Sequence, residues 1–296
     1  MTASPSSNPL PDAVDQVAAS VVGIVSRRGA AAGVVWRAGV AVTSAAALWR
    51  STRVQVVLPD GEQIDGQVRG VDAGTDLAAL AFDGGPAPVA APAAETPLRA
   101  GDVVFAVGRE PSGLVQASFG HVGAVAGEWR SWRGGRIDRL IRLDGGLYPG
   151  FAGAPVADAA GHVVGVASPV FSRSHAVVLP ASTVDRVLNS LLAHGRVRQG
   201  YLGIAAQPVR AQIDGAAVDG LLVSSVAEDG PAAAAGLLVG DVVVSAGGQP
   251  VSSIDALRSR LGADAVGGRI ELRIARGGQA VALTLDVAER PQRSCR

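Results

Sequence analysis

Short apolar runs, each closed by glycine or another turn-forming residue, recur along most of this 296-residue chain. The chain contains 39 glycines, many of them in valine-rich surroundings, and only 4% of its residues are aromatic. Short runs of β-branched and other apolar residues between turn signals are typical of β-strands. The sequence therefore predicts a mainly β protein with many tight turns.

The expected strands form two sets of about six, which is typical of a pair of β-barrels. A segment rich in proline, alanine and glycine separates the two sets at residues 83–97. We expect the barrels at about residues 20–82 and 98–180. A helix over residues 182–194 should follow, because its apolar residues share one helical face.

Signals at both ends of this helix support its boundaries. Ser182 and Asp185 have the spacing of a capping box, and Gly195 can end the helix. Residues 196–200 are polar and are expected to form a hinge.

Beyond the hinge the sequence pattern changes. A glycine-bearing segment, Tyr201-Leu202-Gly203-Ile204, precedes further short apolar runs and a helix at about residues 253–261. A final hairpin is expected to turn at Gly277-Gly278. These features divide the chain into a disordered tail at 1–11, a double-barrel domain at 12–195, a hinge at 196–200, a second domain at 201–290 and a tail at 291–296.

The segment Arg142–Val156 is a glycine-rich loop between two apolar runs. Its spacing resembles the nucleophile loop of the HtrA (Deg) branch of trypsin-like serine proteases, where Thr-Asp-Ala is followed after three residues by Pro-Gly-Asn-Ser-Gly-Gly-Pro. The positions in register are Asp144, Pro149, Gly150, Gly153 and Pro155. The serine nucleophile of the family then falls on Ala152, whose methyl group cannot attack a carbonyl.

Two further motifs of this family occur in the right order. The histidine of the family lies at a strand end that corresponds to Gly39–Leu48, and its position is taken by Ala46. The aspartate motif, Asp-x-x-Thr-Asp-Leu-Ala-x-Leu, is present at Asp72–Leu80, so Asp76 is the one triad side chain left. The alternative role of Asp76 is structural: it would accept hydrogen bonds from the backbone or from Thr75 and hold its loop.

The resemblance implies a trypsin-like double β-barrel followed by a bacterial PDZ domain at residues 201–290, in a protein without proteolytic activity. Removing the serine or histidine of a triad lowers turnover about 10⁶-fold. The N–H groups of Gly150 and Ala152 would remain as part of an oxyanion hole, which together with binding leaves roughly 10³–10⁴-fold catalysis over water. The expected function is therefore peptide or protein binding, as an adaptor, a chaperone-like protein or a regulator.

The alternative function is that of an active serine-type endopeptidase with an unrecognised nucleophile. A Ser–Lys dyad is excluded, because all 26 basic residues are arginine, and the single cysteine, Cys295, lies in the polar tail. His175 is the strongest candidate for a relocated base; its alternative role is that of an ordinary loop histidine. No cofactor or metal is expected, since no histidine or cysteine spacing is typical of metal ligands.

PDZ domains bind a peptide C-terminus as an added strand, and backbone N–H groups surround its carboxylate. The resemblance assigns this role to Tyr201, Leu202, Gly203 and Ile204. Leu257 and Leu261, four residues apart on one helical face, would line the pocket for a small apolar terminal side chain. Ordinary core packing explains the same spacing equally well.

A second candidate binding surface is a loop that would border the active-site entrance of the family. Its residues of interest are Trp129, Arg130, Trp132, Arg133 and Arg136. Tryptophan and arginine are enriched among the residues that dominate binding energies. The alternative is a solvated hairpin whose tryptophans pack on the barrel.

The chain has 26 basic and 26 acidic residues, so its net charge does not favour nucleic acid as a partner. No signal peptide and no apolar run of about 18 residues is recognisable, which predicts no membrane span and a cytoplasmic location, although members of the resembled family mostly work in the cell envelope. Expected partners are peptide or protein C-termini and active HtrA-type relatives. Because no aromatic residue precedes Trp36, the N-terminal trimer contact of the family is not expected, and the oligomeric state stays open.

Overall fold

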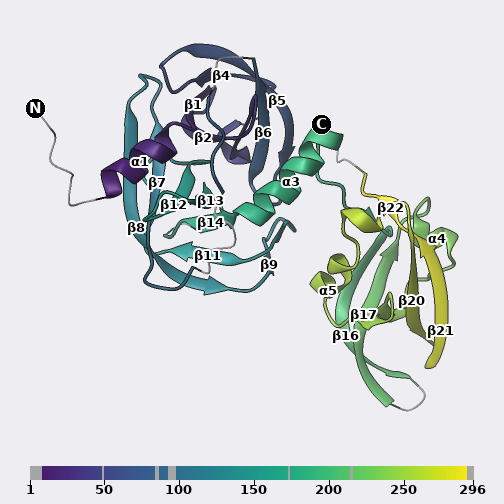
Figure 1. The fold of residues 1–296 in the computed structure, drawn as a ribbon. Helices are drawn as coiled ribbons and strands as arrows, with labels where there is room; N and C mark the ends of the chain where they lie inside the picture. Colours follow the sequence, from purple (N-terminus) through teal and green to yellow (C-terminus); the bar gives the residue numbers. More distant parts are fainter. Residues whose placement is uncertain are drawn as a thin grey trace, which may run out of the picture. The chain divides into compact units, whose positions relative to one another are not determined.

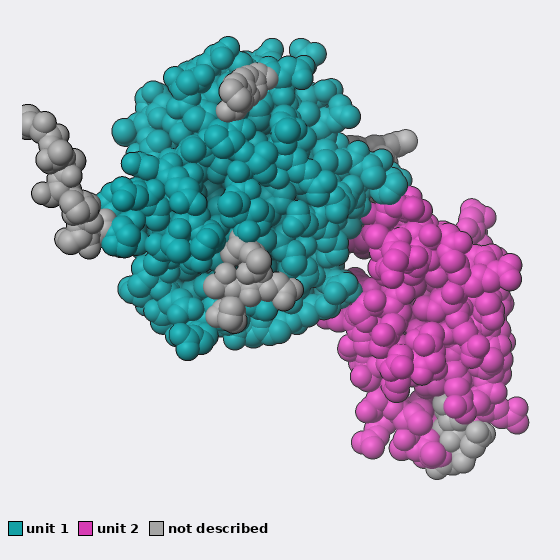
Figure 2. Space-filling model, in the orientation of Figure 1, with its two compact units in different colours: residues 1–197 teal, residues 198–296 magenta. Residues whose placement is uncertain are grey.

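The chain folds into two compact units, Met1–Val197 and Arg198–Arg296 (Figures 1 and 2). The computed structural model describes residues 9–48, 50–83, 87–92, 98–172, 174–213 and 216–291. The expected tails, at residues 1–11 and 291–296, lie mostly outside the described residues, as does much of the predicted linker at residues 83–97.

Unit 1 contains two closed barrels of six antiparallel strands, which confirms the predicted mainly β, double-barrel fold. The first barrel runs in the order β1 (Val21–Ser26), β2 (Gly29–Arg37), β3 (Val40–Ser44), β6 (Leu77–Phe82), β5 (Gln63–Asp72) and β4 (Arg53–Val57). The second runs in the order β11 (Leu140–Leu143), β14 (Val177–Pro180), β13 (Val163–Ser168), β12 (Pro155–Asp158), β7 (Val103–Arg109) and β8 (Val115–Ala126). A short antiparallel pair, β9 (Trp129–Arg130) and β10 (Arg136–Ile137), lies between β8 and β11 in the chain.

Helix α3 (Ala181–His194) packs against β5 and β6 of the first barrel and against β13 and β14 of the second (Figure 1). Its buried apolar face consists of Val184, Val187, Leu188 and Leu191. The helix ends at Gly195, whose φ of 70° lies in the left-handed region and whose N–H donates to the Leu191 carbonyl at 2.8 Å. The apolar face of α3 therefore packs against both barrels.

The predicted capping box at the start of α3 is wrong. Pro180 is the N-cap residue, and no side chain caps this end. Asp185 instead accepts a hydrogen bond from the indole Nε1 of Trp36 at 2.8 Å, and Thr183 Oγ1 accepts one from the Asp138 N–H at 3.0 Å. Asp185 and Thr183 thus bond to donors from other parts of unit 1 and do not cap the helix.

The buried guanidinium of Arg109 joins four segments of unit 1. It donates to the carbonyls of Ala18 (2.9 Å), Val21 (2.8 Å), Pro59 (3.3 Å) and Gly113 (2.9 Å). Ala18 is the last residue of helix α1 (Leu10–Ala18). Burial lowers the pKa of Arg109, and the charge of Asp60 opposes this.

Unit 2 is built around one antiparallel sheet. Its strands run in the order β16 (Ile204–Ile213), β17 (Ala216–Val226), β18 (Val242–Ala246), β20 (Arg269–Arg276) and β21 (Gln279–Asp286), and β19 (Gln249–Pro250) pairs with β18. Strands β15 (Gly200–Tyr201) and β22 (Ala288–Glu289) pair where the chain enters and leaves the unit. The helical segments are α4 (Pro231–Ala234), α5 (Ile254–Ser259) and η1 (Ala263–Ala265).

Helix α5 is shorter than the predicted helix at residues 253–261: Ser253 is its N-cap and accepts a hydrogen bond from the Ala256 N–H at 3.1 Å, and Arg260 is its C-cap. A bidentate ion pair fixes the turn before β18. Arg276 donates to both carboxylate oxygens of Asp241, at 2.8 and 2.7 Å. Burial raises the pKa of Asp241, but the hydrogen bonds from Arg276 and the Leu238 N–H and the charge of Arg276 outweigh this effect, so the pKa lies below its usual value.

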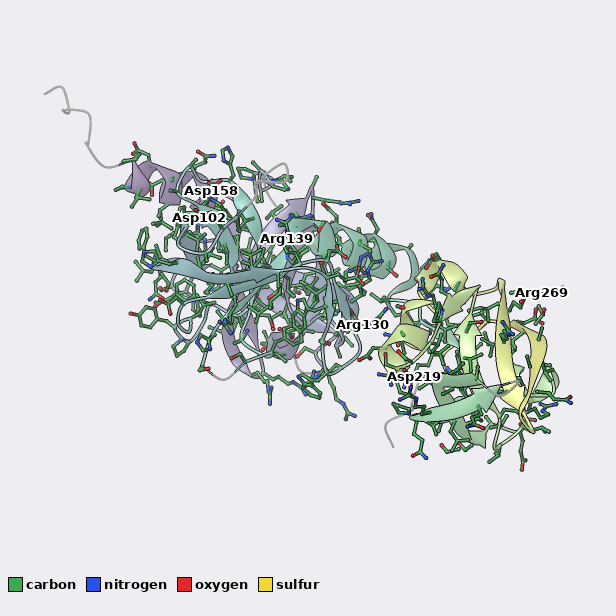
Figure 3. The ribbon with its side chains drawn as sticks, turned by 90° about the horizontal axis from the view of Figure 1, so that it is seen from below. Asp102, Arg130, Arg139, Asp158, Asp219 and Arg269 are labelled. Carbon is green, nitrogen blue, oxygen red and sulfur yellow. The ribbon has the colours of Figure 1, made fainter. Side chains whose placement is uncertain are left out.

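Charged side chains of both signs are exposed on unit 2, and Asp219 and Arg269 are examples (Figure 3). Among the described residues, no group of three or more histidine, cysteine or acidic side chains is close enough to hold a metal ion. No described helix has the length and hydropathy needed to cross a membrane.

Candidate functional site

The turn that presents Asp76 is held by the side chain of Asp72. The Asp72 carboxylate accepts hydrogen bonds from the N–H groups of Gly74 and Thr75, both at 3.1 Å, and from the Thr75 hydroxyl at 2.6 Å. These bonds support the left-handed backbone of Asp76, which has a φ of 58°. The first aspartate and the threonine of the motif thus have a structural role, because they shape the turn.

The Asp76 carboxylate is buried and accepts three hydrogen bonds. The donors are the hydroxyls of Ser44 (2.8 Å) and Ser168 (2.7 Å) and the N–H of Ala46 (2.9 Å), the second residue of helix α2 (Ala45–Leu48). Of the two donors expected for a structural Asp76, the backbone is the one observed, because the Ala46 N–H bonds to the carboxylate, whereas the Thr75 hydroxyl bonds to Asp72. Sequence reasoning missed Ser44 and Ser168 as partners of Asp76, since Ser44 lies in the Gly39–Leu48 motif without an expected role and Ser168 lies in none of the quoted motifs.

Burial raises the pKa of Asp76 above its usual value. The hydrogen bonds from Ser168, Ala46 and Ser44 and the charge of Arg133 oppose this shift without cancelling it. The protonated carboxyl is therefore more favourable in the folded protein than in the unfolded chain.

The loop that carries Ala152 begins with a tight turn. The Phe151 N–H donates to the Tyr148 carbonyl at 3.3 Å, and Gly150 has a φ of 94°. Pro149 followed by a glycine of positive φ is typical of a type II turn. In the described part of the chain, the N–H groups of Gly150 and Ala152 have no hydrogen-bond acceptor. The two donors of the predicted oxyanion-hole remnant therefore remain unpaired.

Close backbone contact places this loop beside the end of β3. A Cβ added to Gly153 would lie 2.5 Å from both the Ser44 nitrogen and Thr43 Oγ1, so only glycine fits there. The Ala152 carbonyl accepts a hydrogen bond from the Ala32 N–H at 3.1 Å. Because Ser44 and Ala46 both bond to Asp76, these contacts gather the sequence-predicted positions Ala46, Asp76 and Ala152 at one site.

Phe151 fills the interior of the second barrel. Its side chain is 2% exposed and lies in the apolar cluster of that barrel, and its ring centroid is 6.5 Å from that of Tyr148. The Tyr148 ring is 69% exposed. The loop thus has one buried and one exposed aromatic side chain beside Ala152.

His175 lies in a loop and forms a hydrogen bond through Nδ1 with the exposed hydroxyl of Ser174 at 2.7 Å. Its N–H donates to Ser172 Oγ at 3.2 Å. No carboxylate among the described residues bonds to the other ring nitrogen, so nothing there orients the imidazole in the manner of a triad.

The loop with the tryptophans and arginines docks on the Asp76 turn. Ser131 is buried, and its hydroxyl donates to the Gly74 carbonyl at 2.6 Å while accepting from the N–H groups of Arg133 and Gly135 at 3.2 Å. A Cβ added to Gly135 would lie 2.2 Å from the Gly74 carbonyl carbon. The loop is thereby held in one position against the turn.

The predicted peptide-binding residues of unit 2 lie together at the start of β16. Gly203 has a φ of 82°, and the Gly200 N–H donates to the Leu261 carbonyl at 2.9 Å, which brings the segment after α5 to this loop. Tyr201, Ile204 and Leu261 are half-buried. Leu202 and Leu257 are 2% and 5% exposed and belong to the core of the unit.

Comparisons with known proteins agree with this architecture. A trypsin-like peptidase domain model matches residues 31–166, and a PDZ domain model matches residues 200–287. A probable periplasmic serine endoprotease, DegP-like, from Pseudomonas savastanoi pv. phaseolicola is 34% identical over 250 residues, which cover 80% of this chain and 51% of that protein. The chain thus spans about half the length of the curated relatives it matches.

Two solved structures extend the comparison over nearly the whole chain. The serine endoprotease from Yersinia pestis is 25% identical, with a TM-score of 0.80 and coverage of 98% of this chain and 100% of that one. The HtrA-type protease AlgW with tripeptide is 27% identical, with a TM-score of 0.76 and coverage of 98% and 99%. The predicted cytoplasmic location is wrong, because the DegP-like relatives are named periplasmic and point to the cell envelope.

Replacing Asp76 with asparagine should change how stability depends on pH. Because the folded pKa is raised, the wild-type chain loses stability as pH rises through it, whereas asparagine does not titrate. The stability of Asp76→Asn relative to the wild type should therefore increase from about pH 4 to about pH 7. Urea unfolding at both pH values measures this, with the exposed Asp65→Asn as control; parallel pH profiles would refute the assignment.

The docking of the loop on the Asp76 turn can be tested with two alanine substitutions. Gly135→Ala should destabilise unit 1 by about 1–3 kcal/mol, because its methyl group would overlap the Gly74 backbone. Gly127→Ala should be close to neutral, since nothing lies within 4 Å of its added Cβ. Equal midpoints of urea unfolding for the two variants would contradict the observed contact.

Proposed function

Because this chain belongs to the HtrA/Deg family of trypsin-like serine proteases with a PDZ domain, we propose that it is a member without proteolytic activity that binds peptides or proteins. The observation that carries the proposal is the pair of methyl groups of Ala46, whose N–H bonds to Asp76, and of Ala152, whose loop lies against Ser44 through Gly153. Neither can accept a proton or attack a carbonyl.

The hydrogen bonds of Asp76 also support the proposal. In a triad the carboxylate orients an imidazole and stabilises its charge. Here Asp76 already accepts three hydrogen bonds, from Ser44, Ser168 and Ala46, and a carboxylate has about one further acceptor site. In the proposed function the carboxylate stabilises the fold, because it has hydrogen-bond donors without an imidazole.

The remaining groups would give little catalysis. Loss of the serine or the histidine of a triad lowers turnover about 10⁶-fold, and loss of both lowers it little further. The unpaired N–H groups of Gly150 and Ala152 could stabilise an oxyanion, but such a hole with binding supplies roughly 10³–10⁴-fold over water. The rate at which such a chain cleaves a bound polypeptide would therefore be negligible beside that of an active protease.

The edge of β16 is the proposed peptide-binding surface of unit 2. The Ala227 N–H donates to the Gly203 carbonyl at 2.7 Å, and Ile204 lies opposite Val226. In this register Ile204 belongs to a non-hydrogen-bonded pair, so its own N–H points away from β17. An added strand could bond there, with its carboxylate at the Leu202–Ile204 amides.

Relatives support a peptide ligand in general terms, since the HtrA-type protease AlgW has been solved with a tripeptide and with a decapeptide. The proposed role is that of an adaptor, a chaperone-like protein or a regulator of active relatives. The predicted preference is for a small apolar C-terminal residue, because Ile204 and Leu261 are half-buried and apolar.

The second candidate is an active serine-type endopeptidase. It is favoured by the names of the relatives and by the 2.7 Å contact between Ser174 and His175. Both side chains belong to an exposed contact in a loop, so the site would lack the enclosed geometry that nucleophilic catalysis uses.

Restoring both missing side chains should restore activity. Ala46→His with Ala152→Ser would place an imidazole beside Asp76 and a hydroxyl beside the oxyanion donors, so casein hydrolysis and fluorophosphonate labelling should appear. Either single variant, and the wild type, should stay inactive because base and nucleophile act as a unit. Casein cleavage by the wild type that persists through rigorous purification and is lost in Ser174→Ala would instead establish the endopeptidase.

If unit 2 captures C-termini, the affinity for a peptide should depend strongly on its free C-terminal carboxylate. A fluorescent peptide ending in valine should bind at least about tenfold more tightly than its amidated form, because charge-assisted hydrogen bonds to the amides are lost. Leu261→Asp should weaken binding of the free peptide, whereas Leu238→Asp, at a side chain 54% exposed, serves as control. Equal affinity of both peptide forms, measured by fluorescence anisotropy, would rule out this mode.

A further inference from the structure

The tip of the loop between β9 and β10 carries a preformed pair of side chains. Trp132 is 72% exposed, the largest value among the large apolar side chains described. The guanidinium carbon of Arg133 lies 4.5 Å from the centroid of the Trp132 ring, which is cation–π distance. An indole and a guanidinium are therefore displayed together at the surface.

The backbone under this pair is fixed. Ser131, directly before it, bonds to Gly74, and Gly135, shortly after it, lies in van der Waals contact with the same residue. A surface whose backbone is already ordered loses less conformational entropy when it binds. The tip thus has the preorganisation of a binding surface.

The two tryptophans of the loop have different roles. Trp129 is half-buried, and its ring meets Phe171 edge-on with centroids 5.6 Å apart. Its Nε1 is buried and has no partner among the described residues. Trp129 therefore packs on the barrel, as the alternative interpretation of the loop predicts, whereas Trp132 does not.

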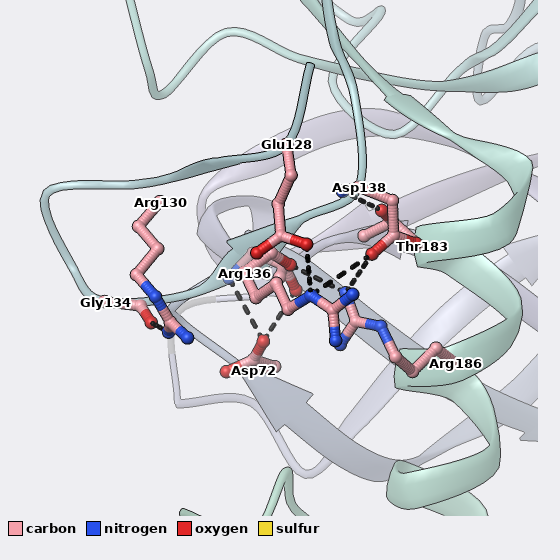
Figure 4. Close-up of polar contacts among 9 residues, drawn as sticks. Asp72, Glu128, Arg130, Gly134, Arg136, Asp138, Thr183 and Arg186 are labelled. Atoms are coloured by element: carbon pink, nitrogen blue, oxygen red, sulfur yellow. Dashed lines mark hydrogen bonds and ion pairs between the residues drawn. The ribbon is translucent and has the colours of Figure 1, made fainter. Parts of the chain in front are cut away.

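The arginines of the loop also differ from one another, and Figure 4 shows the contacts of Arg130 and Arg136. Arg136 pairs with Glu128 at 2.9 Å and lies 3.7 Å from Asp138, and Arg130 donates to the Gly134 carbonyl at 3.3 Å. Arg133 is exposed and takes part in no ion pair within the described part of the chain. Its charge acts through space on the buried carboxylate of Asp76.

We propose that Trp132 and Arg133 form a docking site for an acidic polypeptide segment in which carboxylates alternate with apolar side chains. The guanidinium can bind a carboxylate in a bidentate manner, and the indole offers an apolar face beside it. Tryptophan and arginine are the residue types that most often dominate protein interfaces.

Charge distribution favours a polypeptide over other anionic partners. Nucleic acids and anionic membranes are bound by stripes or clusters of many cations. Here the chain carries 26 basic and 26 acidic residues, and Arg136 is compensated by Glu128. The exposed guanidinium of Arg133 next to the indole of Trp132 fits a short acidic and apolar motif.

The proposed docking site belongs to unit 1 and does not depend on capture of C-termini by unit 2. The probe is a fluorescein-labelled peptide of alternating glutamate and phenylalanine with an amidated C-terminus, which offers no carboxylate terminus. A matched peptide with glutamine in place of glutamate tests the charge. Fluorescence anisotropy with the full chain at low and high ionic strength gives the affinities.

Trp132→Ala and Arg133→Glu should each weaken binding of the acidic peptide at least about tenfold. Arg133→Gln, which keeps much of the side chain, should weaken it less than Arg133→Glu and should reduce its dependence on salt. The control Arg53→Glu reverses an exposed charge elsewhere in unit 1 and should bind like the wild type. Circular dichroism melting confirms that each variant is folded.

The proposal is overturned if the folded Trp132→Ala and Arg133→Gln variants bind the peptide like the wild type. It is also overturned if the wild type does not bind the acidic peptide more tightly than the glutamine peptide. Binding of phosphatidylserine vesicles or of an oligonucleotide that requires Trp132, without binding of the peptide, would assign the surface to another class of partner.

Discussion

The buried carboxylate of Asp76 is the interaction on which the first unit depends. It lies between β5 and β6 of the first barrel and accepts hydrogen bonds from Ser44, at the end of β3, and from Ser168, at the end of β13 in the second barrel. A buried charge is tolerable only when it is well bonded. The same carboxylate therefore joins the two barrels and specifies how their loops meet.

Backbone contacts at glycines complete this arrangement. Gly135 meets Gly74 beside the Asp76 turn, and Gly153 meets Ser44 beside the Ala152 loop. A side chain at Gly135 or Gly153 would overlap backbone atoms, so these contacts set the spacing of three loops without any catalytic group. The geometry of a protease site can thus persist with methyl groups at Ala46 and Ala152.

The sequence predicts the barrels and the unit after them because strands and tight turns leave local patterns. It also locates Ala46, Asp76 and Ala152, since each lies in a motif with fixed spacing. Contacts between distant residues leave no such pattern: Ser44 and Ser168 were missed as partners of Asp76. Asp185 shows the same limit, because its spacing indicates a cap while its carboxylate bonds to Trp36.

The hydroxyls that bond to Asp76 bear on what the loops bordering the site can do. Removing an imidazole from a triad would leave a buried carboxylate short of a donor, but Ser44, Ser168 and the Ala46 N–H supply donors from within the fold. Under the proposed function, the loops that border the site have no catalytic requirement to meet. Their exposed tips can carry binding chemistry, and the backbone beneath the Trp132–Arg133 pair is held by the contacts of Ser131 and Gly135 with Gly74.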